Sequence, residues 1–69
     1  METKTIQGEV MQVTPTNVIF KDERNILYTI PNGKEESIEV RDEIVVFYVG
    51  EIQEVSPAII KNIVKIERE

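Results

Sequence analysis

Branching at the β-carbon dominates the apolar side chains of this chain and constrains its fold more than any other feature. Isoleucine and valine together contribute 20 residues, whereas leucine and alanine contribute one each. Side chains branched at Cβ lose rotamer freedom in a helix but pack well on the pleated surface of a sheet. Turn-forming and polar residues divide the chain into short apolar runs, a spacing that is typical of all-β domains. The sequence therefore predicts strands along most of its length.

The chain is too short for a second domain, because its 69 residues are about half of the common domain length. It contains neither cysteine nor histidine. That composition excludes disulfides, thiolate zinc sites and nucleophilic catalysis by Ser-His or Cys-His pairs. We therefore expect one small β-barrel domain over residues 1–69, with no catalytic residue, no cofactor and no metal site, and we expect that it is not an enzyme.

The first apolar run predicts a long strand over residues 5–13. Apolar residues alternate as far as Val10 and the alternation then slips by one position, which indicates a β-bulge or a sharp bend. Gly8 supports this interpretation, because a glycine inside a strand often marks a bend or a close backbone approach. The Thr-Pro-Thr-Asn stretch that follows predicts a turn over residues 14–17.

The middle of the chain predicts a hairpin followed by a central strand. The predicted pieces are strands at 18–21 and 26–30 joined by a polar turn at 22–25, a stop at 31–33, a loop at 34–37, a short extended piece at Ile38 and Val40, a turn at Arg41–Asp42, and a strand at 43–49. Within it the run over 44–49 is apolar on both faces, which is typical of a strand that is covered on both sides or that curls.

The last part of the chain predicts a turn at 49–51, a loop at 52–55 and one ambiguous segment at 58–66. This segment fits a helical stripe, with Ser56 as the N-cap and Pro57 as the first helical residue, but its apolar residues also fit the alternation of a strand. Because five of its nine residues are branched at Cβ, we favour a strand.

Five strands in this order, with a long bent first strand and a hairpin after it, predict a five-stranded Greek-key barrel of the OB-fold type. Two alternatives stay open. One is an SH3-like barrel, and the other is a barrel whose C-terminal segment is helical. A closed barrel removes the exposed strand edges that promote aggregation.

A motif in the second half of the chain adds to this prediction. It consists of Gly50, Ile52, Glu54, Pro57 and Ala58, which follow an aromatic strand end. With this motif, residues 40–66 resemble the YobA-like family of unknown function, whose pattern is Gly-x-Ile-x-Glu-Ser-Tyr-Pro-Ala with Gly-Asp before the strand. This chain departs from the pattern at Arg41, where the family has Gly, and at Val55 and Ser56, where it has Ser-Tyr.

The resemblance implies a small OB-fold-like domain and a strand rather than a helix over residues 58–66. It also implies a bacterial origin, mostly Gram-positive, in a family whose members are often secreted or lipid-anchored. It implies no activity, because none is assigned to the family. If the family uses the tyrosine of its pattern for contact, this chain has lost that ring at Ser56.

The charge of the chain argues against nucleic acid as the partner. The net charge is −5, and residues 35–56 hold seven acidic side chains against one arginine. Binding to phosphates requires clustered Lys and Arg, and no basic stripe is visible in the sequence. The acidic groups also lack the spacing of a calcium loop. The alternative function is binding of single-stranded nucleic acid by Tyr28, Tyr48, Lys21 and Lys61, since OB-folds stack bases on exposed rings. We favour the interpretation that these rings fill the core.

Two apolar residues in an acidic segment provide the main candidate site. Gly50, Ile52, Glu54, Val55 and Ser56 are predicted to contact a protein or peptide partner, although the same residues could equally cover an open end of the barrel. We therefore expect a monomeric interaction module. A role as an accessory structural domain of a larger secreted or lipid-anchored protein is a further alternative.

The compartment follows only from what the sequence lacks. No run of about 18 apolar residues exists, and the first residues lack the apolar core of a secretory signal. We therefore expect a cytoplasmic protein if the sequence is taken as given. An extracytoplasmic protein is expected instead if the chain is a trimmed piece of a longer one.

Overall fold

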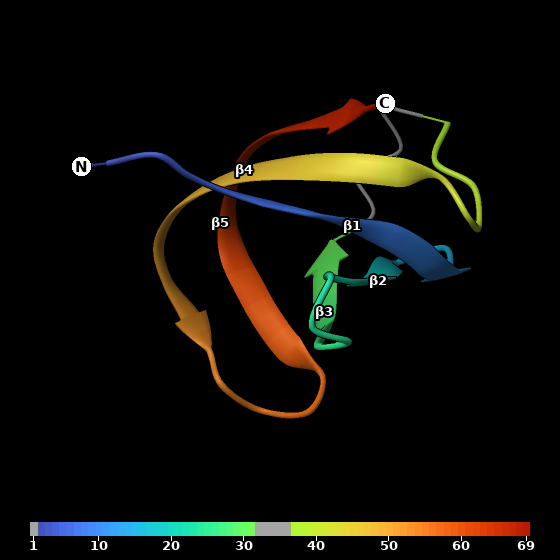
Figure 1. The fold of residues 1–69 in the computed structure, drawn as a ribbon. Coiled ribbons are helices and arrows are strands. Elements are labelled where there is room, and N and C mark those ends of the chain that lie inside the picture. The colour runs from blue at the N-terminus through green and yellow to red at the C-terminus, as the bar shows by residue number, and fades with distance from the viewer. Residues whose placement is uncertain (1, 32–36) are drawn as a thin grey trace.

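The computed structural model describes residues 2–31 and 37–69. Within them the chain forms five strands that close into a barrel, and it forms no helix (Figure 1). The strands are β1 (Lys4–Val13), β2 (Asn17–Lys21), β3 (Leu27–Pro31), β4 (Glu43–Gln53) and β5 (Ala58–Arg68). The all-β prediction is confirmed, and the ambiguous C-terminal segment is a strand.

The order of the strands around the barrel is β1-β2-β3-β5-β4, and β4 pairs back to β1. Neighbouring strands are antiparallel, except for β3 and β5, which are parallel over a short contact. This arrangement is that of a small OB-fold-like barrel. β1 therefore serves two neighbours, with its first half beside β4 and its second half beside β2.

The bulge predicted in β1 lies between Val10 and Gln12, where the pairing with β2 shifts by one residue. Just before it, Gly8 lies against the end of β2. A β-carbon at Gly8 would overlap the carbonyl oxygen of Lys21 and would lie 2.7 Å from Cδ2 of Phe20. The close backbone approach predicted for Gly8 is confirmed.

The core is formed by the side chains that point into the barrel, on alternate positions of each strand. The buried apolar side chains are Val10, Val18, Phe20, Tyr28, Ile30, Ile44, Val46, Tyr48, Ala58 and Ile60. The rings of Phe20 and Tyr28 stack with their centroids 5.3 Å apart. Among the described residues every buried polar side-chain atom has a hydrogen-bond partner.

The predicted turn at 49–51 is wrong, and the predicted loop at 52–55 begins two residues later, at Glu54, because β4 continues to Gln53. Gly50 has a φ of 81°, and the pairing with β5 shifts between Val49 and Ile52. The glycine therefore forms a bulge that bends the strand without ending it. Figure 1 shows the resulting curvature of β4.

A second bulge changes which side chains of β5 face the barrel. The predicted alternating set included Asn62 and Val64, but both are exposed, and Val64 is 55% exposed. The pairing with β4 shifts so that Phe47 lies opposite Lys65 and Tyr48 lies opposite Ile63. This shift leaves Val64 as an extra residue in β5, between Ile63 and Ile66, and both of these isoleucines pack against the core.

The predicted extended piece at Ile38 and Val40 is also wrong. The backbone N–H of Asp42 donates to the carbonyl oxygen of Glu39 (3.1 Å), and the N–H of Glu39 donates to Oδ2 of Asp42 (2.8 Å). These bonds form the turn that was predicted at Arg41–Asp42. Within it Arg41 has a φ of 78°. Most of the predicted stop at 31–33 and loop at 34–37 lies outside the described residues.

Candidate functional site

The five residues predicted to contact a partner lie on two different elements. Gly50 and Ile52 belong to β4, whereas Glu54, Val55 and Ser56 lie in the loop that joins β4 to β5. The three loop residues are exposed, and Val55 is 50% exposed. Ile52 is half-buried and packs against the core. Ile52 therefore turns toward the barrel, while Val55 faces solvent.

The residues predicted to bind nucleic acid do not form an exposed stacking surface. Tyr28 and Tyr48 are only 5% and 7% exposed and belong to the core. A ring buried to this degree offers little surface to a base, which supports the interpretation that both rings fill the core. Lys21 is half-buried at the end of β2, and Lys61 is exposed on β5.

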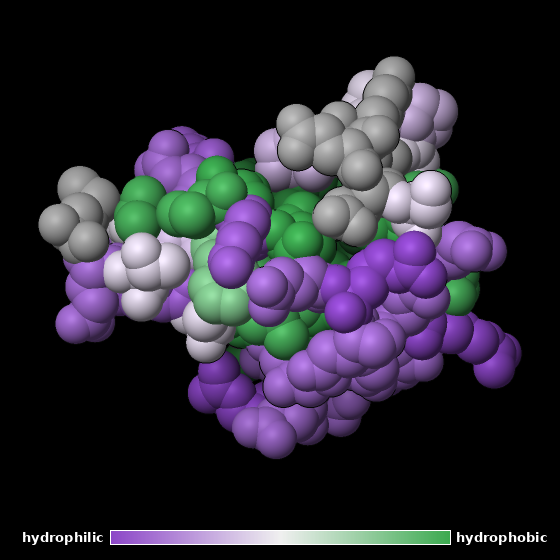
Figure 2. Space-filling view, turned by 90° about the horizontal axis from the view of Figure 1, so that it is seen from above, coloured by the Kyte–Doolittle hydropathy of each residue, from purple (hydrophilic) through white to green (hydrophobic). Residues whose placement is uncertain are grey.

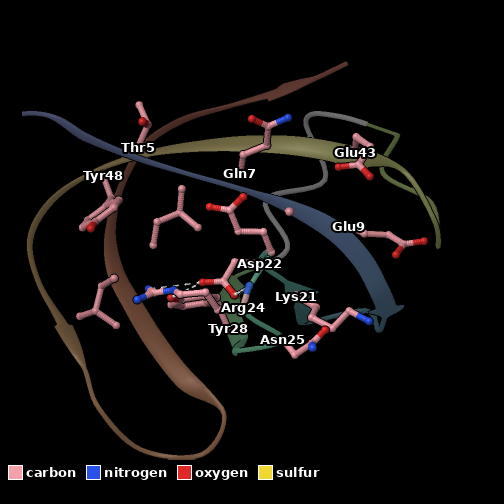
Figure 3. A pocket seen from close by; sticks show the side chains of 14 residues that line it. Thr5, Gln7, Glu9, Lys21, Asp22, Arg24, Asn25, Tyr28, Glu43 and Tyr48 are labelled. Atoms are coloured by element: carbon pink, nitrogen blue, oxygen red, sulfur yellow. Dashed lines mark hydrogen bonds and ion pairs between the residues drawn. The ribbon is translucent and has the colours of Figure 1, made fainter.

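A hollow of about 750 Å³ lies between the first half of β1 and the turn that joins β2 to β3 (Figure 3). Its apolar part consists of Ile6, Tyr28, Tyr48 and Ile52, of which the tyrosines are buried and the isoleucines half-buried. Its remaining lining is polar and is contributed by Thr5, Gln7, Gly8, Glu9, Lys21, Asp22, Glu23, Arg24, Asn25 and Glu43. The hollow is thus a concave site with an apolar floor and a charged rim.

The hollow exists because β2 ends early. The last pair between β1 and β2 joins Glu9 to Lys21, and Asp22 then turns the chain away from β1. Oδ1 of Asp22 accepts hydrogen bonds from the backbone N–H groups of Arg24 (2.9 Å) and Ile26 (3.0 Å). Such Asx bonds fix a tight turn. Among the strands that the structure describes, none therefore pairs with the first half of β1 on its β2 side.

The same carboxylate joins the turn to the core. The hydroxyl of Tyr28 donates a hydrogen bond to Oδ2 of Asp22 (3.0 Å), and Nη2 of Arg24 lies 3.6 Å from this oxygen. Burial by itself would raise the pKa of Asp22, but bonds from Ile26, Tyr28 and Arg24 and the charge of Arg24 hold this pKa below its ordinary value. Burial, and then the bond to Asp22, raise the pKa of Tyr28 above its ordinary value.

The backbone of β1 presents to the hollow polar groups with which no strand of the described residues pairs. The N–H of Val10 donates to the carbonyl oxygen of Asp42 (2.8 Å), so the backbone groups of Val10 point toward the β4 side. Successive residues of a strand point these groups to opposite sides. The N–H and C=O groups of Thr5 and Gln7 therefore point away from β4 and into the hollow. Within the described residues no strand pairs with them there.

The rim of the hollow is acidic. Among residues 2–31 and 37–69 it carries four carboxylates (Glu9, Asp22, Glu23 and Glu43) and two cations (Lys21 and Arg24), which gives a net charge of −2. Arg24 is already paired with Asp22. Three carboxylates therefore face a ligand with only one lysine to balance them.

A second surface lies on the outer face of β4 and β5. Figure 2 shows apolar side chains among polar ones on the face seen from above. Between β4 and β5 the ammonium group of Lys65 lies 4.6 Å from the centroid of the Phe47 ring. Val64 is exposed nearby on the same strand as Lys65.

Comparisons with protein-family models, with curated proteins and with solved structures gave no match for this chain. In residues 2–31 and 37–69, no group of three or more acidic side chains is placed to hold a metal ion. No helix in those residues is long and apolar enough to span a bilayer. The geometry of the hollow is therefore the main guide to function.

Sequence reasoning named four residues of the hollow as candidate contacts, Ile52 in one hypothesis and Lys21, Tyr28 and Tyr48 in the other, and missed the rest. One signal was present: the Asp-Glu-Arg-Asn stretch at 22–25 begins with a residue that favours an Asx turn. The position along β1 at which β2 ends depends on the register between the two strands. This register cannot be predicted from the sequence alone. The open edge at Thr5 and Gln7 follows from that register.

Proposed function

We propose that the protein is a binding module that holds a short segment of a protein or peptide partner in the hollow between β1 and the β2–β3 turn. The observation that carries this proposal is the combination of an apolar floor, made by Ile6 and Ile52 with the two buried tyrosines, and a charged rim around it. Ligand sites are usually concave, mostly apolar and supplied with a few polar groups that orient the ligand.

The size and the position of the hollow support a small ligand segment. Its volume of about 750 Å³ lies within the range of about 300–1,000 Å³ that is usual for ligand sites. The floor of the hollow packs on the barrel core, and the turn between β2 and β3 is fixed by the hydrogen bonds of Asp22. The site is therefore built on rigid elements. A relation to the YobA-like family is a separate proposal, which rests on the motif at residues 50–58 alone.

The test compares two apolar residues that were predicted to act together. Peptides are selected from a random heptapeptide phage library on the immobilised protein, and the dissociation constant of a recovered peptide is measured by calorimetry for the wild type, Ile52→Ser and Val55→Ser. Ile52 lines the hollow and Val55 lies in the exposed loop. We expect Ile52→Ser to weaken binding by about tenfold or more, because burying an aliphatic side chain contributes about 1.5–3 kcal/mol.

Val55→Ser is the matched control and is expected to change the dissociation constant less than twofold. Both variants are compared at a temperature at which circular dichroism shows them folded. A peptide that loses affinity on Val55→Ser and keeps it on Ile52→Ser would move the site to the loop between β4 and β5. That result would overturn the proposal.

A further inference from the structure

The open edge of β1 determines how a segment in the hollow would be held. Five residues of β1, Lys4 to Gly8, lie beyond its last pair with β2. Thr5 and Gln7 direct two N–H and two C=O groups into the hollow, in the line that β2 would follow if it continued past Lys21. Exposed backbone groups of this kind are a template for an added strand.

The floor of the hollow favours a peptide whose side chains alternate in character. In a strand successive side chains point to opposite faces. A strand laid along β1 would direct every second side chain toward the floor at Ile6 and Ile52, and the intervening ones toward the rim. Apolar side chains suit the floor, and cationic side chains suit the rim, where Glu9, Glu23 and Glu43 outnumber Lys21.

We infer that the hollow binds an extended, basic peptide segment by strand addition to β1, with backbone hydrogen bonds to Thr5 and Gln7. This inference rests on the proposed function and specifies the binding mode and the chemistry of the partner. Two neighbouring hydrogen-bonded positions fit a segment of about five or six residues at ~3.3 Å per residue. Affinity comes from the backbone bonds, and the apolar floor and acidic rim select the sequence.

A second copy of this chain is a poorer occupant of the same edge. Each chain carries a net charge of −5, and pairing two β1 strands would bring two acidic rims together. Like charges across an interface oppose association. A basic segment neutralises the rim instead.

Proline substitution tests the backbone bonds without touching the ladder to β4. The N–H of Gln7 points into the hollow, so Gln7→Pro removes a donor for the added strand while the bonds to β4 remain. Proline is tolerated on edge strands at positions whose N–H faces solvent. Gln7→Ala is the matched control, because both variants lose the side-chain bond from Nε2 of Gln7 to Oε2 of Glu69 (2.8 Å) and only proline removes the N–H. Thr5→Pro and Thr5→Ala form a second pair if Gln7→Pro does not fold.

The probe is a capped hexapeptide in which lysine and valine alternate, titrated into ¹⁵N-labelled protein at low salt. We expect shifts at β1 and at the 22–25 turn, a dissociation constant for Gln7→Ala within about twofold of the wild type, and at least tenfold weaker binding to Gln7→Pro. The counterpart peptide with glutamate in place of lysine is expected to bind at least tenfold more weakly than the lysine peptide.

The other outcomes separate the inference from the proposed function. Equal binding to Gln7→Pro and Gln7→Ala, with shifts still at the hollow, would overturn strand addition and leave a peptide site. Shifts at the hollow with equal affinity for both peptides would overturn the basic partner. No shift at the hollow with either peptide would count against both proposals. Concentration-dependent shifts of β1 without peptide would assign the edge to a second copy and overturn the inference.

Discussion

Gly8→Val is expected to unfold the protein. A β-carbon at this position would overlap the backbone carbonyl oxygen of Lys21 and press on the buried ring of Phe20. Relief requires β1 and β2 to separate where the barrel closes, since a backbone atom cannot rotate away as the end of a flexible side chain can. Overpacking commonly costs about 1–3 kcal/mol and sometimes more. A core of this size supplies only about 3–5 kcal/mol.

Urea denaturation followed by circular dichroism measures this effect, with Gly50→Ala as the control. Gly50 has a φ of 81°, but a β-carbon there would come no closer than 3.3 Å to Nδ2 of Asn62. The left-handed backbone costs a non-glycine residue about 1–2 kcal/mol, so Gly50→Ala is expected to remain folded with reduced stability. A Gly8→Val protein as stable as Gly50→Ala would contradict the close approach of β1 and β2.

Asp22→Ala is expected to lower the free energy of unfolding by roughly 2–3 kcal/mol. The substitution removes the acceptor for two backbone N–H groups of the turn and leaves the hydroxyl of Tyr28 without its partner. An unsatisfied buried donor costs about 1–3 kcal/mol. Denaturation at pH 7 measures this loss. A loss below about 0.5 kcal/mol would show that the turn does not depend on Asp22.

Asp22 also makes the stability depend on pH. Its pKa in the folded protein lies below the ordinary value, so the folded state favours the carboxylate. The resulting stabilisation is fully present above the pKa of the unfolded chain, which is about 3.9, and is lost as the pH falls through the lower folded pKa. Asp22→Asn keeps an oxygen acceptor but does not titrate. We expect the stability of this variant to fall less steeply than that of the wild type below about pH 4. If the stability of the two proteins fell equally steeply with pH, the ionised carboxylate of Asp22 would not stabilise the fold, which would contradict this account.

The sequence alone predicted the elements of this fold well, because each signal was local. The excess of Cβ-branched residues gave strands, the slip after Val10 gave the bulge in β1, and Gly8 gave the close approach to β2. The last segment was correctly assigned as a strand because propensity outweighed a helical pattern of apolar residues.

The errors came from features that depend on pairing between strands. Glycine is typical of turns, so Gly50 predicted a turn. Instead, β5 continues to pair with β4 beyond Gly50, and β4 remains one strand. The strict alternation expected for β5 fails beyond Ile60: Ile63 and Ile66 pack against the core, and Val64 is an extra residue opposite Phe47 and Tyr48. The run over 44–49 is apolar on both faces, so the alternation could not show which way Tyr48 points.

The candidate site was predicted only in part for the same reason. Ile52 was singled out as an apolar residue in an acidic segment, and it lines the hollow. The floor residue Ile6 and the edge at Thr5 and Gln7 carry no distinctive sequence signal. They become a site only because β2 stops opposite Glu9.

The central claim is that β1 has an unpaired edge that accepts a peptide strand, and amide hydrogen exchange of β1 tests it most directly. The N–H groups of Ile6 and Gly8 face β4, and that of Gln7 faces the hollow. We expect slow exchange at Ile6 and Gly8, fast exchange at Gln7, and protection of Gln7 when the alternating lysine–valine peptide is added. Protection of Gln7 in the free protein, or no gain of protection with saturating peptide, would contradict the account.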